Sequence, residues 1–180
     1  MRILLVGGSK SGKSMLAQRL TKSLHEDAPM YYFAAMEPVD DEDRERIKKH
    51  VADREGWGFL TVERARSVDE VTLDQDGAVL FDSVTALLAN EMFGDEKAPD
   101  PKRRTLSELN KLSLSVKHFV CVADELFRDG SEYGGLTEEY RRGLAFVLNS
   151  LAEEFDTVCE VVCGVPKVLK GELPPIGETV

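Results

Sequence analysis

The chain has 180 residues, of which 42% are hydrophobic and 31% are charged, and its formal net charge is -10. These values are typical of a folded globular protein, and they exclude a disordered or fibrous chain. We expect one domain over residues 1–180, with a loosely held tail over residues 170–180. The acidic balance disfavours nucleic acid and anionic membranes as partners, so any phosphate-binding site must be a local feature.

The three cysteines, Cys121, Cys159 and Cys163, form no paired framework and lack the spacings of a zinc site. Two of them lie in apolar runs, where a buried thiol that acts as a small apolar side chain is the simplest interpretation. The first residues lack the features of a signal peptide, and no apolar run approaches the roughly 18 residues of a membrane span. We therefore expect a cytoplasmic protein without a membrane span.

The first third of the chain alternates apolar runs with helical patterns. Residues 3–6 are a continuous apolar run bounded by glycine, which predicts a buried strand. Residues 13–24 have apolar side chains at helical spacing, and residues 30–35 form the next apolar run. Residues 40–54 are highly charged and contain neither Gly nor Pro, which predicts an exposed helix.

The same alternation continues to the end of the chain. The further expected elements are a short strand over residues 59–62, a buried strand over 78–81, a helix over 83–92, a loop over 94–101, a helix over 105–114, a strand over 118–123, a mobile glycine-bearing segment over 128–135, a helix over 136–154 and a last strand over 157–163. Strands that alternate with amphipathic helices predict an α/β fold. We expect a P-loop NTPase-like, mainly parallel β-sheet with helices on both faces.

A phosphate-binding motif lies between the first predicted strand and the first predicted helix. Its Gly-x-x-x-x-Gly-Lys-Ser pattern predicts nucleotide binding, because backbone N–H groups and the helix N-terminus converge on phosphate oxygens. In this pattern Lys13 reaches the β- and γ-phosphates of GTP or ATP, and the Ser14 hydroxyl binds Mg²⁺. The predicted cradle consists of Gly7, Gly8, Ser9, Lys10, Ser11, Gly12, Lys13 and Ser14.

A P-loop also needs a carboxylate directed at the metal, usually at the end of a neighbouring apolar strand. Asp82 follows the apolar run 78–81 and fits this role. An aspartate at this position can also be the N-cap of the helix that follows. The sequence leaves both roles open.

Three side chains at helical spacing form a basic face on the predicted helix 40–54. Arg46, His50 and Arg54 follow one another at intervals of four residues, so they share one side of that helix. Two guanidinium groups can hold a triphosphate, and their charges favour a neutral imidazole that can act as a base or a nucleophile. A solvated charged helix, with acidic neighbours, is the alternative interpretation.

Together these residues resemble the bifunctional adenosylcobinamide kinase and adenosylcobinamide-phosphate guanylyltransferase family of cobalamin biosynthesis. The resemblance covers most of the chain. It rests on residues 3–14, on Tyr32-Phe33-Ala34-Ala35, on Arg46-Ile47-Lys48-Lys49-His50 with Arg54, on Asp82-Ser83-Val84-Thr85 with Asn90, and on residues 146–149 and 162–166. Ala123-Asp124-Glu125-Leu126-Phe127 stands where the family has Thr-Asn-Glu-Val-Gly.

The resemblance implies two activities on a small-molecule corrinoid substrate. The side-chain hydroxyl of adenosylcobinamide is first phosphorylated by a nucleoside triphosphate, and GMP is then transferred from GTP with release of pyrophosphate. The histidine that carries GMP covalently in the family matches His50, and the family suggests a homotrimer. The catalytic residues implied here are Lys13, Arg46, His50 and Arg54, with Ser14 and Asp82 at the metal.

Three other functions remain open from the sequence. The chain could be a small-molecule P-loop kinase without guanylyl transfer, or a paralogue that binds nucleotide without turnover. It could also be a nucleotide-dependent switch protein. A GTPase switch would need Asn-Lys-x-Asp after a strand, whereas Asn110-Lys111-Leu112-Ser113 has Ser in the Asp position and lies in a predicted helix.

Overall fold

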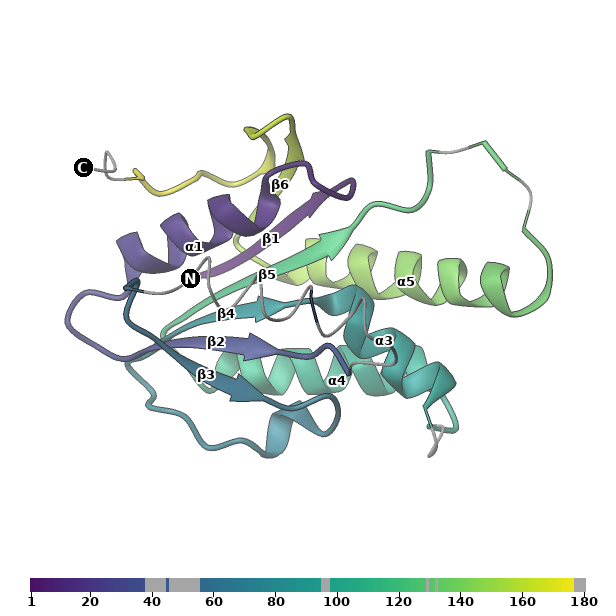
Figure 1. Cartoon of the computed structure of the whole chain (residues 1–180), viewed down its shortest axis with the longest axis horizontal. Helices are drawn as coiled ribbons and strands as arrows, with labels where there is room; N and C mark the ends of the chain where they lie inside the picture. The colour runs from purple at the N-terminus through teal and green to yellow at the C-terminus, as the bar shows by residue number, and fades with distance from the viewer. Residues whose placement is uncertain (38–44, 46–55, 95–97, 129, 132, 177–180) are drawn as a thin grey trace.

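The computed structural model describes residues 1–37, 45, 56–94, 98–128, 130–131 and 133–176. These residues form a seven-stranded sheet in the order β3-β2-β4-β5-β1-β6-β7 (Figure 1). All neighbouring pairs are parallel except β6 and β7, so the predicted α/β class with a mainly parallel sheet is confirmed. The strands are β1 (Arg2–Gly7), β2 (Met30–Ala34), β3 (Phe59–Glu63), β4 (Ala78–Asp82), β5 (His118–Asp124), β6 (Thr157–Val162) and β7 (Val165–Lys170).

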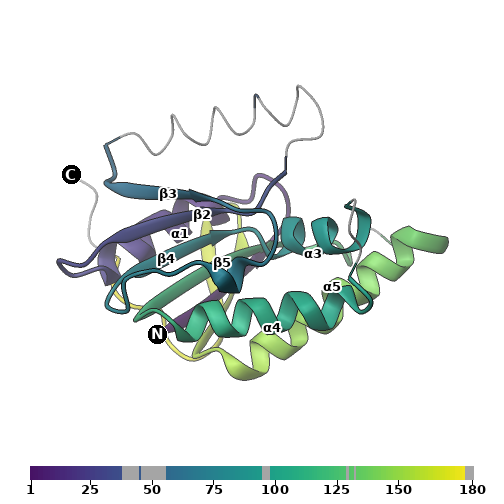
Figure 2. The same ribbon diagram turned by 90° about the horizontal axis from the view of Figure 1, so that it is seen from below.

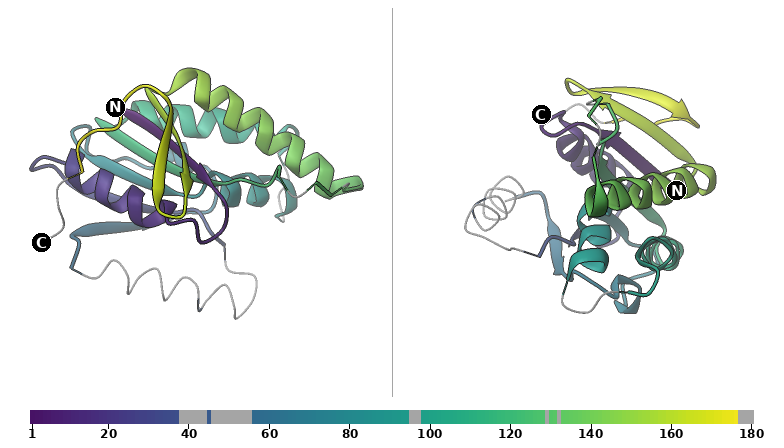
Figure 3. Two further views of the ribbon diagram at one scale, coloured as in Figure 1. Left: turned by 90° about the horizontal axis from the view of Figure 1, so that it is seen from above. Right: turned by 90° about the vertical axis from the view of Figure 1, so that its right-hand side faces the viewer.

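Helices cover both faces of the sheet. The described helices are α1 (Lys13–Leu24), α3 (Val84–Phe93), α4 (Pro101–Leu114) and α5 (Gly135–Glu154), with a short 3₁₀ helix η1 (Val68–Glu70). Helix α1 packs on one face, while α4 and α5 run side by side on the other (Figures 2 and 3). The parallel strands are nearly continuous apolar runs because both of their faces are buried under helices.

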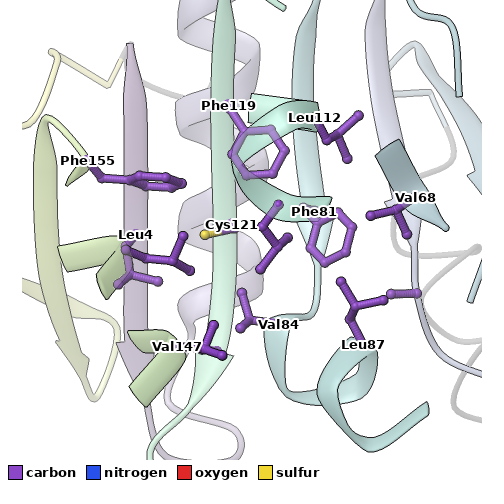
Figure 4. Packing of buried hydrophobic residues seen from close by; sticks show 14 of the residues in the cluster. Leu4, Val68, Phe81, Val84, Leu87, Leu112, Phe119, Cys121, Val147 and Phe155 are labelled. Atoms are coloured by element: carbon purple, nitrogen blue, oxygen red, sulfur yellow. The ribbon is translucent and has the colours of Figure 1, made fainter. Parts of the chain in front are cut away.

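Alternation along the strands divides the core into two layers. On β5, Cys121 and Ala123 belong to the cluster under α3, α4 and α5, whereas Val120 and Val122 belong to the cluster under α1. Figure 4 shows the larger cluster, in which the rings of Phe81 and Phe119 stack with centroids 6.0 Å apart. A side chain on β4 or β5 can therefore be assigned to a face by its position in the strand.

The expectation for the cysteines is confirmed for the two that lie in these layers. Cys121 and Cys159 are buried, and Cys163 is exposed. Burial raises the pKa of Cys159 to about 11, and it also raises the pKa of Cys121. Neither thiol is therefore set up as a nucleophile, because both are held in the protonated form.

The predicted start of α4 is wrong, and so is the expectation that no strand follows residue 163. Residue 101 was expected in a loop, but α4 begins at Pro101, because the Asp100 side chain accepts the Arg103 N–H and proline is favourable in the first turn of a helix. The strand 157–163 was expected to be the last, but β7 follows it as an antiparallel edge strand. The proline in β7 weakened the strand pattern, and an edge strand tolerates it.

The tail makes contacts in the part that the structure describes. Leu173 and Ile176 pack against the cluster under α1, and the Thr157 hydroxyl donates a 2.7 Å hydrogen bond to the Glu172 carbonyl. Among the described helices, none is long and apolar enough to cross a membrane.

Candidate nucleotide-binding site

The strand order places the phosphate-binding motif near the middle of the sheet. Strand β1 lies between β5 and β6, and β4 lies on the far side of β5. The carboxyl ends of β1, β4 and β5 therefore lie at the same edge, where open α/β sheets bind ligands. In register, Gly7 at the end of β1 lies beside Asp124 at the end of β5.

The backbone of the motif has the conformation that its glycines predict. Gly12 has a φ of 92° and is the residue before α1. A Cβ at Gly7 would lie 2.6 Å from the Val161 carbonyl oxygen and 2.7 Å from Ser11 Oγ, so no larger residue fits there. Gly8, Ser9 and Lys10 are exposed, so the loop is open on its outer side. These features form a cradle with accessible backbone N–H groups.

The turn between β6 and β7 supports the cradle from one side. The Gly164 N–H donates a 2.7 Å hydrogen bond to the Ser11 carbonyl. A Cβ at Gly12 would lie 3.0 Å from Gly164 Cα, so the two backbones are in close contact. The turn that leads into β7, the strand that the sequence did not predict, thus helps to hold the phosphate-binding loop in place.

Lys13 lies in the cradle with its ammonium group already bound. It is only 8% exposed, its Nζ lies 2.6 Å from Asp124 Oδ1, and it donates a 3.2 Å hydrogen bond to the Gly8 carbonyl. An ammonium group at the N-terminus of α1, close to the cradle backbone, is suited to contact phosphate oxygens.

Asp82 is the last residue of β4 and lies on the α1 face of the sheet, the same face as Leu80. Its Oδ2 accepts a 2.7 Å hydrogen bond from the Tyr32 hydroxyl. The N-cap of α3 is Ser83, whose Oγ accepts the Ala86 N–H, so the capping alternative for Asp82 is wrong. Its carboxylate lies at the ligand-binding edge of the sheet.

The side chains of the cradle suit a phosphate and a hard cation. Ser11 Oγ is buried and has no hydrogen-bond partner among the described residues, which leaves a polar atom for a ligand to bind. Ser14 and Asp82 supply hydroxyl and carboxylate oxygen, the donor types that Mg²⁺ prefers. No three metal-binding side chains gather in the described part of the chain. The residues therefore fit a Mg²⁺ ion that would be bound partly by these protein oxygens and partly by the phosphate oxygens of a nucleotide.

The basic face predicted for residues 40–54 cannot be placed in this arrangement. Arg46, His50 and Arg54 lie outside the described residues. Asn90 is described, and its Nδ2 donates to the carbonyls of Ala35 and Ala65, at 2.7 and 2.9 Å. It therefore links α3 to the segments that follow β2 and β3, which is a structural role.

Asp124 is a candidate site residue that sequence reasoning did not assign. Like Asp82, it is an acid that directly follows a buried apolar run, so the same signal could have identified it. The predicted strand 118–123 ended one residue too early, since β5 includes Asp124. Only the strand order puts this residue beside the cradle.

A separate cavity of about 600 Å³ lies where the N-terminal ends of α4 and α5 meet the C-terminal end of α3. Met92 and Tyr133 contribute apolar and aromatic surface, while Lys102, Glu138 and Arg142 contribute charges. None of the cradle residues lines it. It is large enough for a small organic group.

Comparison with known proteins finds a matching family and similar proteins. The family described as cobinamide kinase / cobinamide phosphate guanyltransferase matches residues 3–169. The bifunctional adenosylcobalamin biosynthesis protein CobP of Pseudomonas aeruginosa is 30% identical over 175 residues, which cover 96% of this chain and 99% of that protein. The bifunctional adenosylcobalamin biosynthesis protein CobU of Salmonella typhimurium is 36% identical over 186 residues, which cover 94% and 100%.

A solved structure from Pyrococcus horikoshii OT3 resembles the fold alone. It superimposes with a TM-score of 0.51 at 9% identity, over 94% of this chain and 86% of that one.

Proposed function

Because the chain belongs to the cobinamide kinase / cobinamide phosphate guanyltransferase family, we propose that it catalyses two successive steps on a corrinoid. A nucleoside triphosphate first phosphorylates the side-chain hydroxyl of adenosylcobinamide. GMP is then transferred from GTP to the adenosylcobinamide phosphate. The observation that carries the proposal is the cradle itself, in which Lys13 Nζ lies beside the Gly8 carbonyl and the buried Ser11 Oγ has no hydrogen-bond partner among the described residues.

In the kinase step, the substrate hydroxyl oxygen attacks the γ-phosphorus of the bound nucleotide. A new O–P bond forms, the bond from the γ-phosphorus to the bridging oxygen breaks, and a nucleoside diphosphate leaves with the hydroxyl proton released to solvent or to a nearby base. The cradle backbone holds the phosphates in line, and the Lys13 ammonium stabilises the charge that develops between the β- and γ-phosphates.

Ser14 and Asp82 are the residues that would hold Mg²⁺. Bound there, Mg²⁺ would neutralise charge on the phosphates. The Tyr32 hydroxyl orients the Asp82 carboxylate through the 2.7 Å hydrogen bond, which leaves Oδ1 for the metal or its water shell.

In the guanylyl step, His50 is our proposed nucleophile. An imidazole nitrogen attacks the α-phosphorus of GTP, a P–N bond forms and pyrophosphate leaves. A phosphate oxygen of adenosylcobinamide phosphate then attacks the same phosphorus, which breaks the P–N bond and restores the imidazole. The spacing of Arg46, His50 and Arg54 supports this role, because one guanidinium on either side can hold the triphosphate.

Labelling with α-labelled GTP tests the proposal most directly. We expect label to remain on the denatured wild-type protein, with the acid lability and alkali stability of a phosphorus–nitrogen bond. His50→Ala should lose the label and guanylyl transfer while it keeps at least part of the kinase turnover. His25→Ala is the matched control, because His25 ends α1 and its Nδ1 lies 3.2 Å from the Ala28 carbonyl, so it should label like wild type.

The outcomes separate the remaining alternatives. Kinase turnover without any label would indicate a small-molecule kinase that lacks guanylyl transfer. Nucleotide binding without turnover would indicate a paralogue or a switch protein. Label that persists in His50→Ala would overturn His50 as the nucleophile.

The same proposal includes a cytoplasmic location, where nucleoside triphosphates are available, and a homotrimer, as the family resemblance implies. Light scattering on the purified protein tests the oligomeric state. A monomeric mass at micromolar concentration would exclude the trimer.

A further inference from the structure

Asp124 lies at the carboxyl end of β5, between the phosphate-binding strand β1 and the strand β4 that ends in Asp82. Val120 and Val122 pack under α1, so alternation places Asp124 on the same face. Asp82 also lies on that face, but it pairs in register with Val122, two residues earlier on β5. Asp124 therefore extends further toward the cradle than Asp82 does.

The Asp124 carboxylate binds the Lys13 ammonium group, which is also the group that the phosphates of a nucleotide would contact. Its Oδ1 lies 2.6 Å from Lys13 Nζ, and the Lys13 side chain is 10% exposed while that of Asp124 is 36% exposed. An ion pair this close and partly shielded from water is stronger than a fully exposed one. The carboxylate thus occupies one side of the ammonium group.

The backbone at Asp124 is held by contacts that do not involve Lys13. The Asp124 backbone N–H donates a 2.8 Å hydrogen bond to Thr85 Oγ1, and the Thr85 carbonyl accepts a 2.9 Å hydrogen bond from the Tyr140 hydroxyl. The next N–H, that of Glu125, donates to the Gly7 carbonyl at 3.0 Å. The backbone at Asp124 is therefore fixed by α3, α5 and β1 together, independently of Lys13.

We propose that Asp124 is a positioning residue for Lys13, a built-in counter-anion that holds the ammonium in the cradle and that nucleotide phosphates must displace. This inference rests on the proposed nucleotide binding at the cradle. Fixing the lysine in advance lowers the conformational entropy lost when the nucleotide binds. The competition with phosphate has the opposite effect and makes binding weaker than an unopposed lysine would allow. When the γ-phosphoryl group has left, re-formation of the ion pair favours release of the diphosphate.

The test is the affinity for GTP measured by calorimetry in the presence of EDTA, so that no metal bridges the carboxylate and the phosphates. Asp124→Asn should bind GTP roughly three- to tenfold more tightly than wild type, because the competing charge is gone. Asp124→Glu, which keeps the charge, should return the affinity to within about twofold of wild type. Glu26→Gln removes the same charge from an exposed carboxylate that pairs with Lys117 beyond the C-terminal end of α1, and it controls for net charge.

A second background separates competition for Lys13 from simple repulsion of phosphate. In Lys13→Met, the change Asp124→Asn should have a smaller effect than in wild type, because only direct repulsion between the carboxylate and the phosphates remains and there is no ammonium group left to compete for. A fully retained effect in that background would overturn the positioning role. Thermal unfolding of each variant reports folding, and Asp124→Asn should still unfold cooperatively, at a somewhat lower temperature because the ion pair with Lys13 is lost.

The failure of this inference is distinct from the failure of the proposed function. If wild type binds GTP and Asp124→Asn binds it equally or more weakly, Asp124 is not a competing counter-anion, although the cradle remains a nucleotide site. If wild type binds neither GTP nor ATP, with or without Mg²⁺, both ideas are overturned.

Discussion

The hydroxyl of Tyr32 donates a 2.7 Å hydrogen bond to Asp82, and the two residues lie on neighbouring strands, β2 and β4. Tyr32 is buried and Asp82 is half-buried, so the bond is shielded and directs the carboxylate along the α1 face. Because the tyrosine holds one oxygen, the proposed metal role of Asp82 depends on a residue 50 positions away in the sequence.

Tyr32→Phe tests this relationship. Removal of the hydroxyl leaves the Asp82 carboxylate less well oriented, so we expect the Mg²⁺ concentration for half-maximal kinase turnover to rise by about tenfold, and unfolding to cost about 1 kcal/mol less. The control is Tyr31→Phe, the same chemical change on the neighbouring residue, whose hydroxyl accepts the Asp74 N–H at 3.3 Å. Equal Mg²⁺ dependence in the two variants would argue against the orienting role.

Asp82→Asn removes the carboxylate charge but keeps the side-chain volume. We expect its Mg²⁺ requirement to rise by at least about tenfold, which should equal or exceed the effect of Tyr32→Phe, while its thermal stability changes little. Asp76→Asn, at an exposed position of the turn before β4, should behave like wild type. If the turnover of Asp82→Asn falls without any change in Mg²⁺ dependence, the carboxylate serves some purpose other than metal binding.

Lys13→Ala should lower kinase kcat/KM by about 10²- to 10³-fold, because the ammonium group stabilises charge that develops in the transition state. Initial rates with adenosylcobinamide and ATP give this value. Lys22→Ala, near the opposite end of α1, where the ammonium lies over the Trp57 ring, should keep its turnover. A Lys13→Ala enzyme with near-normal kcat would show that the cradle is not the kinase site.

Gly12→Ala should reduce the free energy of unfolding by about 1 to 3 kcal/mol, because its φ of 92° is unfavourable for alanine and the added Cβ would press against Gly164. Gly8→Ala lies in the same cradle, but a Cβ there meets nothing within 4 Å, so a change within about 0.5 kcal/mol is expected. Denaturant unfolding of the two variants measures the difference. Equal free energies of unfolding would show that the space between the cradle and the β6–β7 turn can accommodate an added Cβ.

The local parts of this protein were determined by short stretches of its sequence. Residues 3–14 specify a buried strand, a glycine-bearing loop and a helix N-terminus, and the structure has all three in those places. Each depends on backbone preferences and on a spacing of apolar residues that are local in the sequence. For this reason the α/β class and the cradle conformation could be predicted without knowledge of the neighbouring strands.

The tertiary structure decided which distant groups meet at the cradle. The ion pair between Lys13 and Asp124 joins residues on α1 and β5, and it exists because β5 lies between β1 and β4. Strand order depends on long-range packing under the helices, and no short segment contains that information. The same holds for β7, whose exposed, proline-containing strand is stabilised by pairing with β6 and not by burial of its own side chains.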